Sequence, residues 1–240
     1  MYELLTHDLN SKSGTKLANA LNCRQVLAAS NPNILLINWG VWGVRNHLPI
    51  INERKAVETC CSKMGSYRAF KEHGIKKPEW TTSYTIASNW SRQGYKVYTR
   101  SDDQGCQGRG IIVTEPGLRL PEGLFYTRHF PVTREFRIYT WRDLVLSVFE
   151  KKQPDGNQLD EDVRASDDWL YCRYNLDPYP TELVFQAIQA TKALGLDFSG
   201  IDIALDKEDN VCVFECNSAP WLSEKVAEQL ANQIKKAYPL

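Results

Sequence analysis

The end of the chain carries the feature that most constrains its fold. Two runs in which apolar and polar residues alternate, 201–205 and 211–217, flank a short polar segment. This pattern is typical of a β-hairpin. The hairpin is unusual because acidic residues occur on strands whose other residues are mostly those of a buried core.

Three polar side chains of this hairpin are expected to lie together. Glu215 and Asn217 are two residues apart on one strand and therefore share a face, about 7 Å apart. If residues 207–210 form a four-residue loop, Asp202 lies directly opposite Glu215. Two carboxylates that face each other on a half-buried sheet repel unless a cation lies between them. Carboxylates with an amide oxygen suit Mg²⁺ bound together with phosphate oxygens, whereas the alternative is a solvated outer face of the hairpin.

The overall composition limits the classes of protein to consider. Lys plus Arg balance Asp plus Glu at 29 each, which argues against a general binder of nucleic acids or membrane surfaces. No hydrophobic run approaches the roughly 20 residues of a membrane span, and the first residues are too polar for a signal peptide. With 240 residues the chain can hold one large domain, or a small domain joined to a larger one.

The seven cysteines indicate a reduced, cytoplasmic protein. They are odd in number and lack the spacing of a zinc site or a redox pair. Cys212 and Cys216 are expected on the Phe214 face of the last strand, as small core residues. Cys106 lies in a glycine-rich loop, but no histidine is near it in sequence to support a nucleophilic role.

The rest of the chain predicts a mixture of helices and strands. Periodic apolar positions and capping residues indicate helices at 13–22, from Asn52 to His73, in a short segment ending at Gly94, at 181–194 and at 223–237. Alternating or continuous apolar runs indicate strands at 34–38, 82–86, 95–100, 111–115, 124–130, 135–141 and 144–152. Residues 154–179 are polar and aromatic and indicate a long loop.

A glycine-rich loop is predicted between two of these strands. The backbone N–H groups around Gly105, Gly108 and Gly110 can wrap a phosphate. A strand rather than a helix follows at Ile111, so neither the Rossmann nor the Walker motif fits. The loop alone is therefore weak evidence for nucleotide binding.

Basic residues surround this loop. Lys63 lies at the margin of the apolar stripe of its predicted helix, Arg100 ends the strand before the loop, and Arg109 lies within it. Each alone would usually be a solvated side chain. Together with a glycine loop and a metal site, they are what a triphosphate with Mg²⁺ needs.

Two further strands contribute charges. Glu135 and Arg137 share one face of their strand, and such a pair is usually a surface pair of little energetic value. Lys151 and Lys152 end the next strand and are more often solvated than catalytic.

The order of these motifs resembles the ATP-grasp superfamily, specifically its carboxylate–amine ligases related to glutamate-adding enzymes. The similarity covers roughly residues 52–222, and the compact form is similar to that of members encoded by tailed bacteriophages. The segments that carry it are Ser62-Lys63, Gly74-Ile-Lys-Lys-Pro78, Tyr98-Thr-Arg100, Gly105-Cys-Gln-Gly-Arg-Gly-Ile111, Glu135-Phe-Arg137, Leu194-Gly-Leu-Asp-Phe198, Asp202 and Glu215-Cys-Asn217-Ser-Ala-Pro220.

The resemblance implies an α+β ATP-grasp fold, in which two subdomains clasp ATP. A short α/β unit at 1–52 would precede an ATP-grasp domain at 53–240. That domain would divide into a central subdomain at about 53–125, with the glycine loop, and a carboxy-terminal subdomain at about 126–240, with the metal site.

The resemblance also implies an enzyme, an ADP-forming ligase that uses ATP and Mg²⁺. It would join a carboxylate to an amine, forming an amide or peptide bond through an acyl phosphate. The partners would be small-molecule substrates, an amino acid or a peptide, or else the end of a protein, with no membrane or nucleic acid. Homo-oligomers are common in the family. The alternatives are a catalytically silent nucleotide-binding scaffold and an ATP-grasp phosphotransferase that forms no amide.

The resemblance assigns roles to the candidate residues. The Mg²⁺ ligands would be Asp202, Glu215 and Asn217. The nucleotide would be held by Lys63, Arg100, Glu135 and the loop glycines Gly105, Gly108 and Gly110. The charge that develops during phosphoryl transfer would be stabilised by Arg137, Arg109, Lys151 and Lys152.

Two departures from the family pattern affect these roles. The second basic position, often lysine, is Arg100, which keeps the charge but changes reach and geometry. The hinge reads Tyr126-Thr-Arg-His-Phe130 and lacks the acidic residue that usually lies near the ribose, so no ribose contact is assigned.

Overall fold

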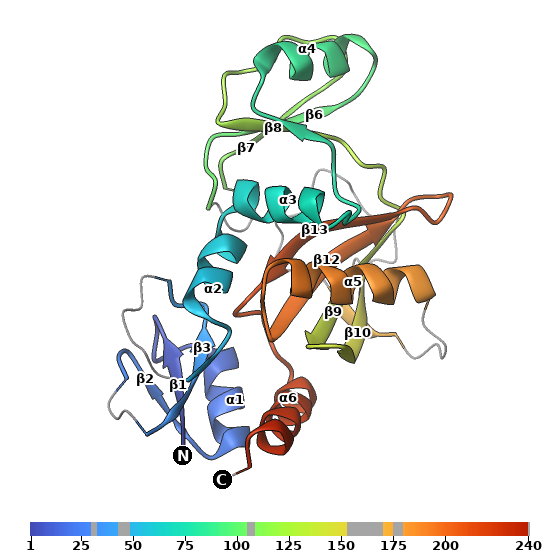
Figure 1. The fold of residues 1–240 in the computed structure, drawn as a ribbon. Helices are drawn as coiled ribbons and strands as arrows, with labels where there is room; N and C mark the ends of the chain where they lie inside the picture. Colours follow the sequence, from blue (N-terminus) through green and yellow to red (C-terminus); the bar gives the residue numbers. More distant parts are fainter. Residues whose placement is uncertain (30–32, 43–48, 105–108, 153–169, 175–179, 240) are drawn as a thin grey trace.

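The computed structural model describes the whole chain except residues 30–32, 43–48, 105–108, 153–169, 175–179 and 240. The described residues form a parallel four-stranded sheet near the N-terminus, an antiparallel four-stranded sheet, and an antiparallel five-stranded sheet. Helices pack against all three (Figure 1). The predicted α+β class is therefore confirmed.

The parallel sheet lies at the N-terminal end of the molecule, with strand order β2-β1-β3-β4. Its strands are β1 (Tyr2–Thr6), β2 (Arg24–Val26), β3 (Leu35–Trp39) and β4 (Ile50–Ile51), and the helix α1 (Lys12–Leu21) follows β1.

The last helix returns to this N-terminal sheet. Helix α6 (Glu224–Ala237) lies beside α1 in Figure 1, and both contribute to one hydrophobic cluster with β1. The hydroxyl of Tyr2 donates a 2.5 Å hydrogen bond to the carbonyl oxygen of Tyr238, so the two ends of the chain meet. The boundary at residues 52 and 53 stays a prediction, but the first unit shares its core with the last helix.

The single helix predicted from Asn52 to His73 is wrong, because the structure has two. Helix α2 (Arg54–Cys61) and helix α3 (Lys63–Glu72) meet at Ser62, whose backbone is extended. The hydroxyl of Ser62 accepts a hydrogen bond from the N–H of Gly65 and so caps α3. Asn52 caps neither helix, since its amide is bonded to the backbone of Phe198 instead.

The central sheet has the strand order β5-β8-β6-β7 and carries helix α4 (Tyr84–Arg92) on one side. Its strands are β5 (Trp80–Thr81), β6 (Val97–Arg100), β7 (Ile111–Thr114) and β8 (Phe125–Arg128). The strand predicted at 82–86 is wrong. Strand β5 ends at Thr81 because Ser83 starts α4, accepting a hydrogen bond from the N–H of Ile86.

The third sheet has the order β11-β10-β9-β12-β13 and holds the acidic hairpin at one edge. Its strands are β9 (Arg134–Trp141), β10 (Leu144–Lys152), β11 (Leu170–Arg173), β12 (Phe198–Leu205) and β13 (Val211–Asn217). Helix α5 (Thr181–Ala193) covers one face, where Phe136 and Ile138 are buried. Tyr139 and Trp141, farther along β9, belong instead to the hydrophobic cluster that contains α6.

Part of the predicted loop at 154–179 is a strand. Residues 170–173 form β11, which pairs with the end of β10, so the loop prediction is wrong there. The rest of that loop prediction lies largely outside the described residues. Within the described part of the chain, every helix is too short or too polar to cross a membrane.

The hairpin β12–β13 has the predicted pairing, but its turn and register differ from the prediction. Asp202 does lie opposite Glu215. However, the four-residue loop is wrong, since Leu205 pairs with Val211 and five residues form the turn. A bulge between Asp202 and Ile203 offsets this shift, because Ile203 pairs with Val213 and leaves one extra residue on β13.

The same bulge corrects the expected positions of two cysteines. Cys216 packs in one cluster with Val211 and Val213, and Cys212 is buried outside that cluster. The prediction that both cysteines share the Phe214 face is therefore wrong, because an inserted residue reverses the alternation of a strand beyond it.

Candidate functional site

The three predicted metal ligands lie together at the end of the hairpin. Asp202 is buried and faces Glu215, whose side chain is 38% exposed. The amide nitrogen of Asn217 lies 3.2 Å from one oxygen of Glu215 and 3.5 Å from one oxygen of Asp202. The structure therefore places the three predicted side chains together.

Arg137 neutralises Asp202 from the neighbouring strand β9. The two residues are register partners, and the guanidinium donates to both carboxylate oxygens, at 2.6 Å each. Burial alone would raise the pKa of Asp202, but Arg137 and Lys151 outweigh it and hold that pKa well below its ordinary value. Burial likewise opposes the charge of Arg137, and the carboxylate of Asp202 raises the pKa of Arg137 instead.

Lys151 joins this pair from strand β10. Its ammonium group lies 2.9 Å from Asp202 and also contacts the carboxylate of Glu135, its register partner on β9. Burial acts to lower the pKa of Lys151, but Asp202 and Glu135 raise it overall. Arg137, Lys151, Asp202 and Glu135, here called the buried network, therefore pair two basic side chains with two acidic ones.

Lys63 is the first residue of α3 and approaches the site from the other side. Its ammonium group lies 2.9 Å from Glu215, and its side chain is 18% exposed. Burial acts to lower the pKa of Lys63, but the carboxylate of Glu215 outweighs burial and raises it. Lys63 thus points into the site, charged, rather than into solvent.

Arg100 ends strand β6 near Lys63. Its guanidinium lies 5.7 Å from the ring centre of Phe125. Among the described residues, the Nε of Arg100 is buried with no hydrogen-bond partner. A buried, unpaired donor is costly and indicates a position for an acceptor such as a phosphate oxygen.

Lys152 is not part of this arrangement. Lys152 is 55% exposed and lies 3.6 Å from Glu150, so it does not reach the buried network. Neighbouring residues of a strand point to opposite faces, which is why only Lys151 turns inward. Arg109 and Gly110 are exposed at the end of the glycine loop, and Gly105 and Gly108 lie outside the described residues.

An aromatic pair, Tyr171 and Trp221, lies next to the site. Tyr171 lies 6.0 Å from the guanidinium of Arg137 and stacks on Trp221, with ring centres 5.5 Å apart. Trp221 is 47% exposed and follows the predicted metal ligand Asn217 by four residues. The only sequence signal was its closeness to Asn217, and the partner Tyr171 comes from a strand that the sequence did not predict.

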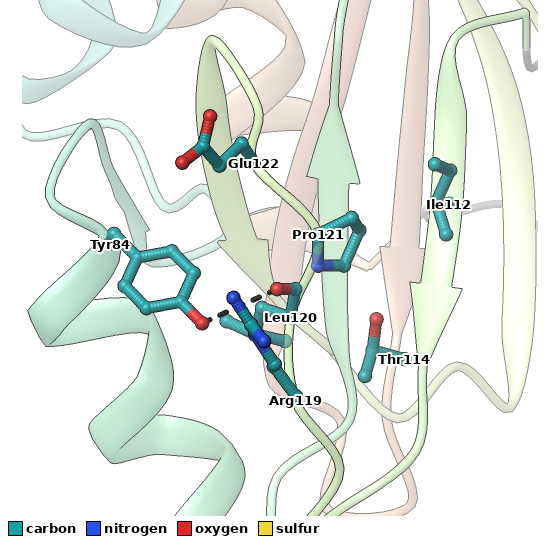
Figure 2. A pocket seen from close by; sticks show the side chains of 7 residues that line it. All are labelled: Tyr84, Ile112, Thr114, Arg119, Leu120, Pro121 and Glu122. Atoms are coloured by element: carbon teal, nitrogen blue, oxygen red, sulfur yellow. Dashed lines mark hydrogen bonds between the residues drawn. The ribbon is translucent and has the colours of Figure 1, made fainter.

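A pocket of about 660 Å³ lies elsewhere, beside α4 and β7 on the central sheet (Figure 2). None of the predicted site residues lines this pocket. Its lining residues are Tyr84, Ile112, Thr114, Arg119, Leu120, Pro121 and Glu122. One arginine and one glutamate are its only charged side chains. It therefore lacks the paired carboxylates and clustered cations that phosphate chemistry needs.

The donor set at the hairpin suits Mg²⁺. Within the described residues no cluster of three or more His, Cys, Asp and Glu side chains is placed to hold a metal. Asp202, Glu215 and Asn217 instead offer two carboxylates and an amide oxygen, which suits an ion that takes its remaining ligands from phosphate and water. The amide of Asn217 would have to turn so that its oxygen, not its nitrogen, faces the carboxylates.

Comparison with known families and sequences gives one partial match. Residues 172–237 match the family model of the RimK-like ATP-grasp domain. A comparison with curated protein sequences finds no match.

Solved structures resemble almost the whole chain. The ATP-grasp ligase PsnB complexed with a minimal precursor has a TM-score of 0.71 at 10% identity, covering 98% of both chains. A PsnB structure that also holds Mg and ADP has a TM-score of 0.69 at 10% identity, covering 98% of this chain and 96% of that one.

Two further solved structures also resemble almost the whole chain. A RimK domain ATP-grasp protein from Sphaerobacter thermophilus has a TM-score of 0.67 at 15% identity, with 96% of this chain and 98% of that chain covered. The macrocyclase MdnC from Microcystis aeruginosa, bound with the precursor peptide MdnA, has a TM-score of 0.63 at 12% identity, with 98% and 100% covered. Likeness over the full chain confirms the predicted fold.

Proposed function

We propose that this chain, which has the ATP-grasp fold, is an ADP-forming ligase that uses ATP and Mg²⁺ to join a carboxylate to an amine. The observation that carries the proposal is the pairing of Asp202 with Glu215, surrounded by Lys63, Arg137 and Lys151. Two carboxylates of the kind that binds a metal and three cations of the kind that binds phosphates support the proposal by lying together.

The proposed reaction has two steps. An oxygen of the substrate carboxylate attacks the γ-phosphorus of ATP, the bond to the β,γ-bridging oxygen breaks, and ADP leaves. The amine then attacks the carbonyl carbon of the acyl phosphate, inorganic phosphate leaves, and the amine loses a proton. Transfer of this kind depends on positioning and charge neutralisation rather than on a protein nucleophile.

The residues of the site would divide this work. Lys63 and Arg100 would hold the α- and β-phosphates. Lys63 lies beside the partly exposed Glu215, and the buried Nε of Arg100 has no hydrogen-bond partner among the described residues. Arg137 and Lys151 would stabilise the charge that develops on the transferred phosphoryl group. Mg²⁺, when bound at Asp202, Glu215 and Asn217, would neutralise phosphate charge.

Two findings support a peptide as the carboxylate substrate. PsnB and MdnC, which resemble this chain, have been solved with precursor peptides. In this chain the half-exposed Trp221 and its partner Tyr171 extend an aromatic surface outward from Arg137. Such a surface can support a chain longer than a single amino acid. A homo-oligomeric state and a protein acceptor stay predictions.

Mg²⁺-dependent ATP turnover with a pool of amino acids and short peptides tests the proposal. We expect ADP release that requires both a carboxylate and an amine and that is lost in Glu215→Ala. Glu208→Ala is the matched control, because Glu208 is an exposed residue in the turn of the same hairpin.

The outcomes separate the alternatives. Phosphorylated product without amide would favour a phosphotransferase. Nucleotide binding without turnover in any pool would favour a silent scaffold. A protein that binds no ATP would overturn the reading of the site.

A further inference from the structure

Helix α3, which carries Lys63, is fastened at its first turn to the segment that follows Arg100. The link is Asp103, whose backbone oxygen accepts from the N–H of Lys63 at 3.0 Å. One carboxylate oxygen accepts from the N–H of Met64 at 2.7 Å. The other accepts from the hydroxyl of Ser62 at 2.5 Å.

These contacts satisfy groups that a helix start otherwise leaves unpaired. The first N–H groups of a helix have no partner within it, and a negative charge there is stabilised by the helix dipole. Ser62 accepts from Gly65, and Asp103 accepts from Ser62 and Met64, so the first turn is capped from two directions. Asp103 therefore replaces the helical continuation that α2 would have supplied.

The link joins two cations that repel each other. Lys63 belongs to α3, and Arg100 ends β6 three residues before Asp103. The backbone bond between Lys63 and Asp103 brings the start of α3 next to the segment that follows β6, so the two cations lie on adjoining parts of the fold. Without a bound phosphate, the backbone must hold them near each other.

We propose that Asp103 is a positioning residue for nucleotide binding, which sets Lys63 and Arg100 at the spacing that one chain of phosphates requires. The inference rests on the proposed nucleotide site. Asp103 does not touch the nucleotide and acts through the placement of Lys63. Its carboxylate is thus an acidic group that strengthens the binding of an anion.

The test is the dissociation constant for MgADP, measured by isothermal titration calorimetry on the full chain. Loss of a capping carboxylate predicts binding about 10-fold weaker in Asp103→Ala and about 3-fold weaker in Asp103→Asn, which keeps one acceptor for Met64. Asp102→Asn is the matched control, since the neighbouring Asp102 is exposed and accepts a hydrogen bond from the N–H of Gln104 in its own loop. The control should bind MgADP as the wild type does.

A second measurement separates positioning from a general loss of structure. In a Lys63→Met background, replacing Asp103 by alanine should change MgADP affinity by less than about twofold, because the residue through which Asp103 acts is gone. An equal loss in both backgrounds would overturn the inference. If Asp103→Ala does not fold, Asp103→Asn takes its place, with Asp102→Asn as the control. Asp103→Asn binding MgADP as tightly as Asp102→Asn would then overturn the inference.

Failure of this inference is distinguishable from failure of the proposed function. If the wild type binds MgADP and Asp103→Asn and Asp103→Ala bind equally well, only the role of Asp103 is overturned. If the wild type binds no MgADP, the proposed function falls, and this inference with it.

Discussion

The two sides of the candidate site differ in how completely their charges are paired. In the buried network, Arg137, Lys151, Asp202 and Glu135 have side chains only 8–10% exposed, and each has a partner of opposite charge. On the open side, Lys63 and Glu215 are 18% and 38% exposed, and Arg100 keeps a buried donor without a partner among the described residues.

This difference separates stability from binding. Charges in the buried network are fixed by one another, so removing one leaves the others uncompensated inside the protein. Charges on the open side are held more loosely and can exchange their partners for phosphate oxygens. We therefore expect substitutions in the buried network to reduce stability as well as turnover, and substitutions on the open side to act mainly on nucleotide binding.

The largest effect is expected from Arg137→Met. It leaves the buried carboxylate of Asp202 with Lys151 alone, and breaking a buried pair by removing one partner costs about 3–5 kcal/mol. Urea unfolding monitored by circular dichroism measures the free energy of unfolding. Arg54→Met is the control, because its pair with Glu58 lies on the helix surface and should contribute only about 0.3–0.5 kcal/mol. Equal losses in the two variants would contradict the comparison.

The pH dependence of stability sharpens the same point. The pKa of Asp202 is lowered in the folded protein, so its stabilising contribution is complete above the unfolded value of about 3.9 and is lost as the pH falls below it. The stability gap between the wild type and Asp202→Asn should therefore be widest near neutral pH and narrow below about pH 4.

Urea unfolding at several pH values from 7 down to 3 measures this gap. Acid effects from groups that do not interact with Asp202 act on both proteins and cancel in the difference. A gap that stays constant with pH would mean that Asp202 stabilises the fold without its charge.

The sequence predicted the acidic pair but not the cause of its register. Asp202 and Glu215 follow from the local two-residue period of strands. The loop is one residue longer than predicted, and the bulge beside Ile203 shifts the register back. Local patterns do not reveal a bulge, because its cost and benefit depend on the packing of both faces of the sheet.

Contacts between distant segments could not be predicted from the sequence, for a related reason. The apolar period of residues 52–73 continues through Ser62, yet the helix breaks there because Asp103, 41 residues away, bonds its hydroxyl. Similarly, the sequence named both Lys151 and Lys152, and only the register of β10 against β9 selects Lys151. Pairing across the fold, rather than composition, decides both.

On the open side, Lys63→Met should affect binding far more than folding. The pair with Glu215 is partly exposed, so its loss should change the free energy of unfolding by about 1 kcal/mol or less. Loss of a charged hydrogen bond to phosphate should weaken MgADP binding about 10- to 100-fold. Calorimetric titration and urea unfolding of the same preparation measure both. A stability loss as large as that of Arg137→Met would remove the distinction between the two sides.

The smallest effect on stability, and one of opposite sign, is expected from Arg100→Met. The Nε of Arg100 is buried without a partner in the described structure, and an unsatisfied buried donor costs about 1–3 kcal/mol. Methionine fills similar space without that donor, so the variant should be as stable as the wild type or up to about 1 kcal/mol more stable. MgADP binding should weaken, since a cation proposed to bind phosphate is lost.

Arg128→Met serves as the control for stability in this last case. Arg128 ends strand β8 of the same sheet but has partners, the carboxylate of Glu79 at 2.5 Å and the ring of Tyr95 at 4.4 Å. Its replacement should lower stability by about 0.5–1 kcal/mol. If Arg100→Met is destabilised as much as Arg128→Met, then Arg100 is already satisfied without nucleotide. The open side would then be as self-contained as the buried network, and an unpaired arginine would no longer indicate a phosphate there.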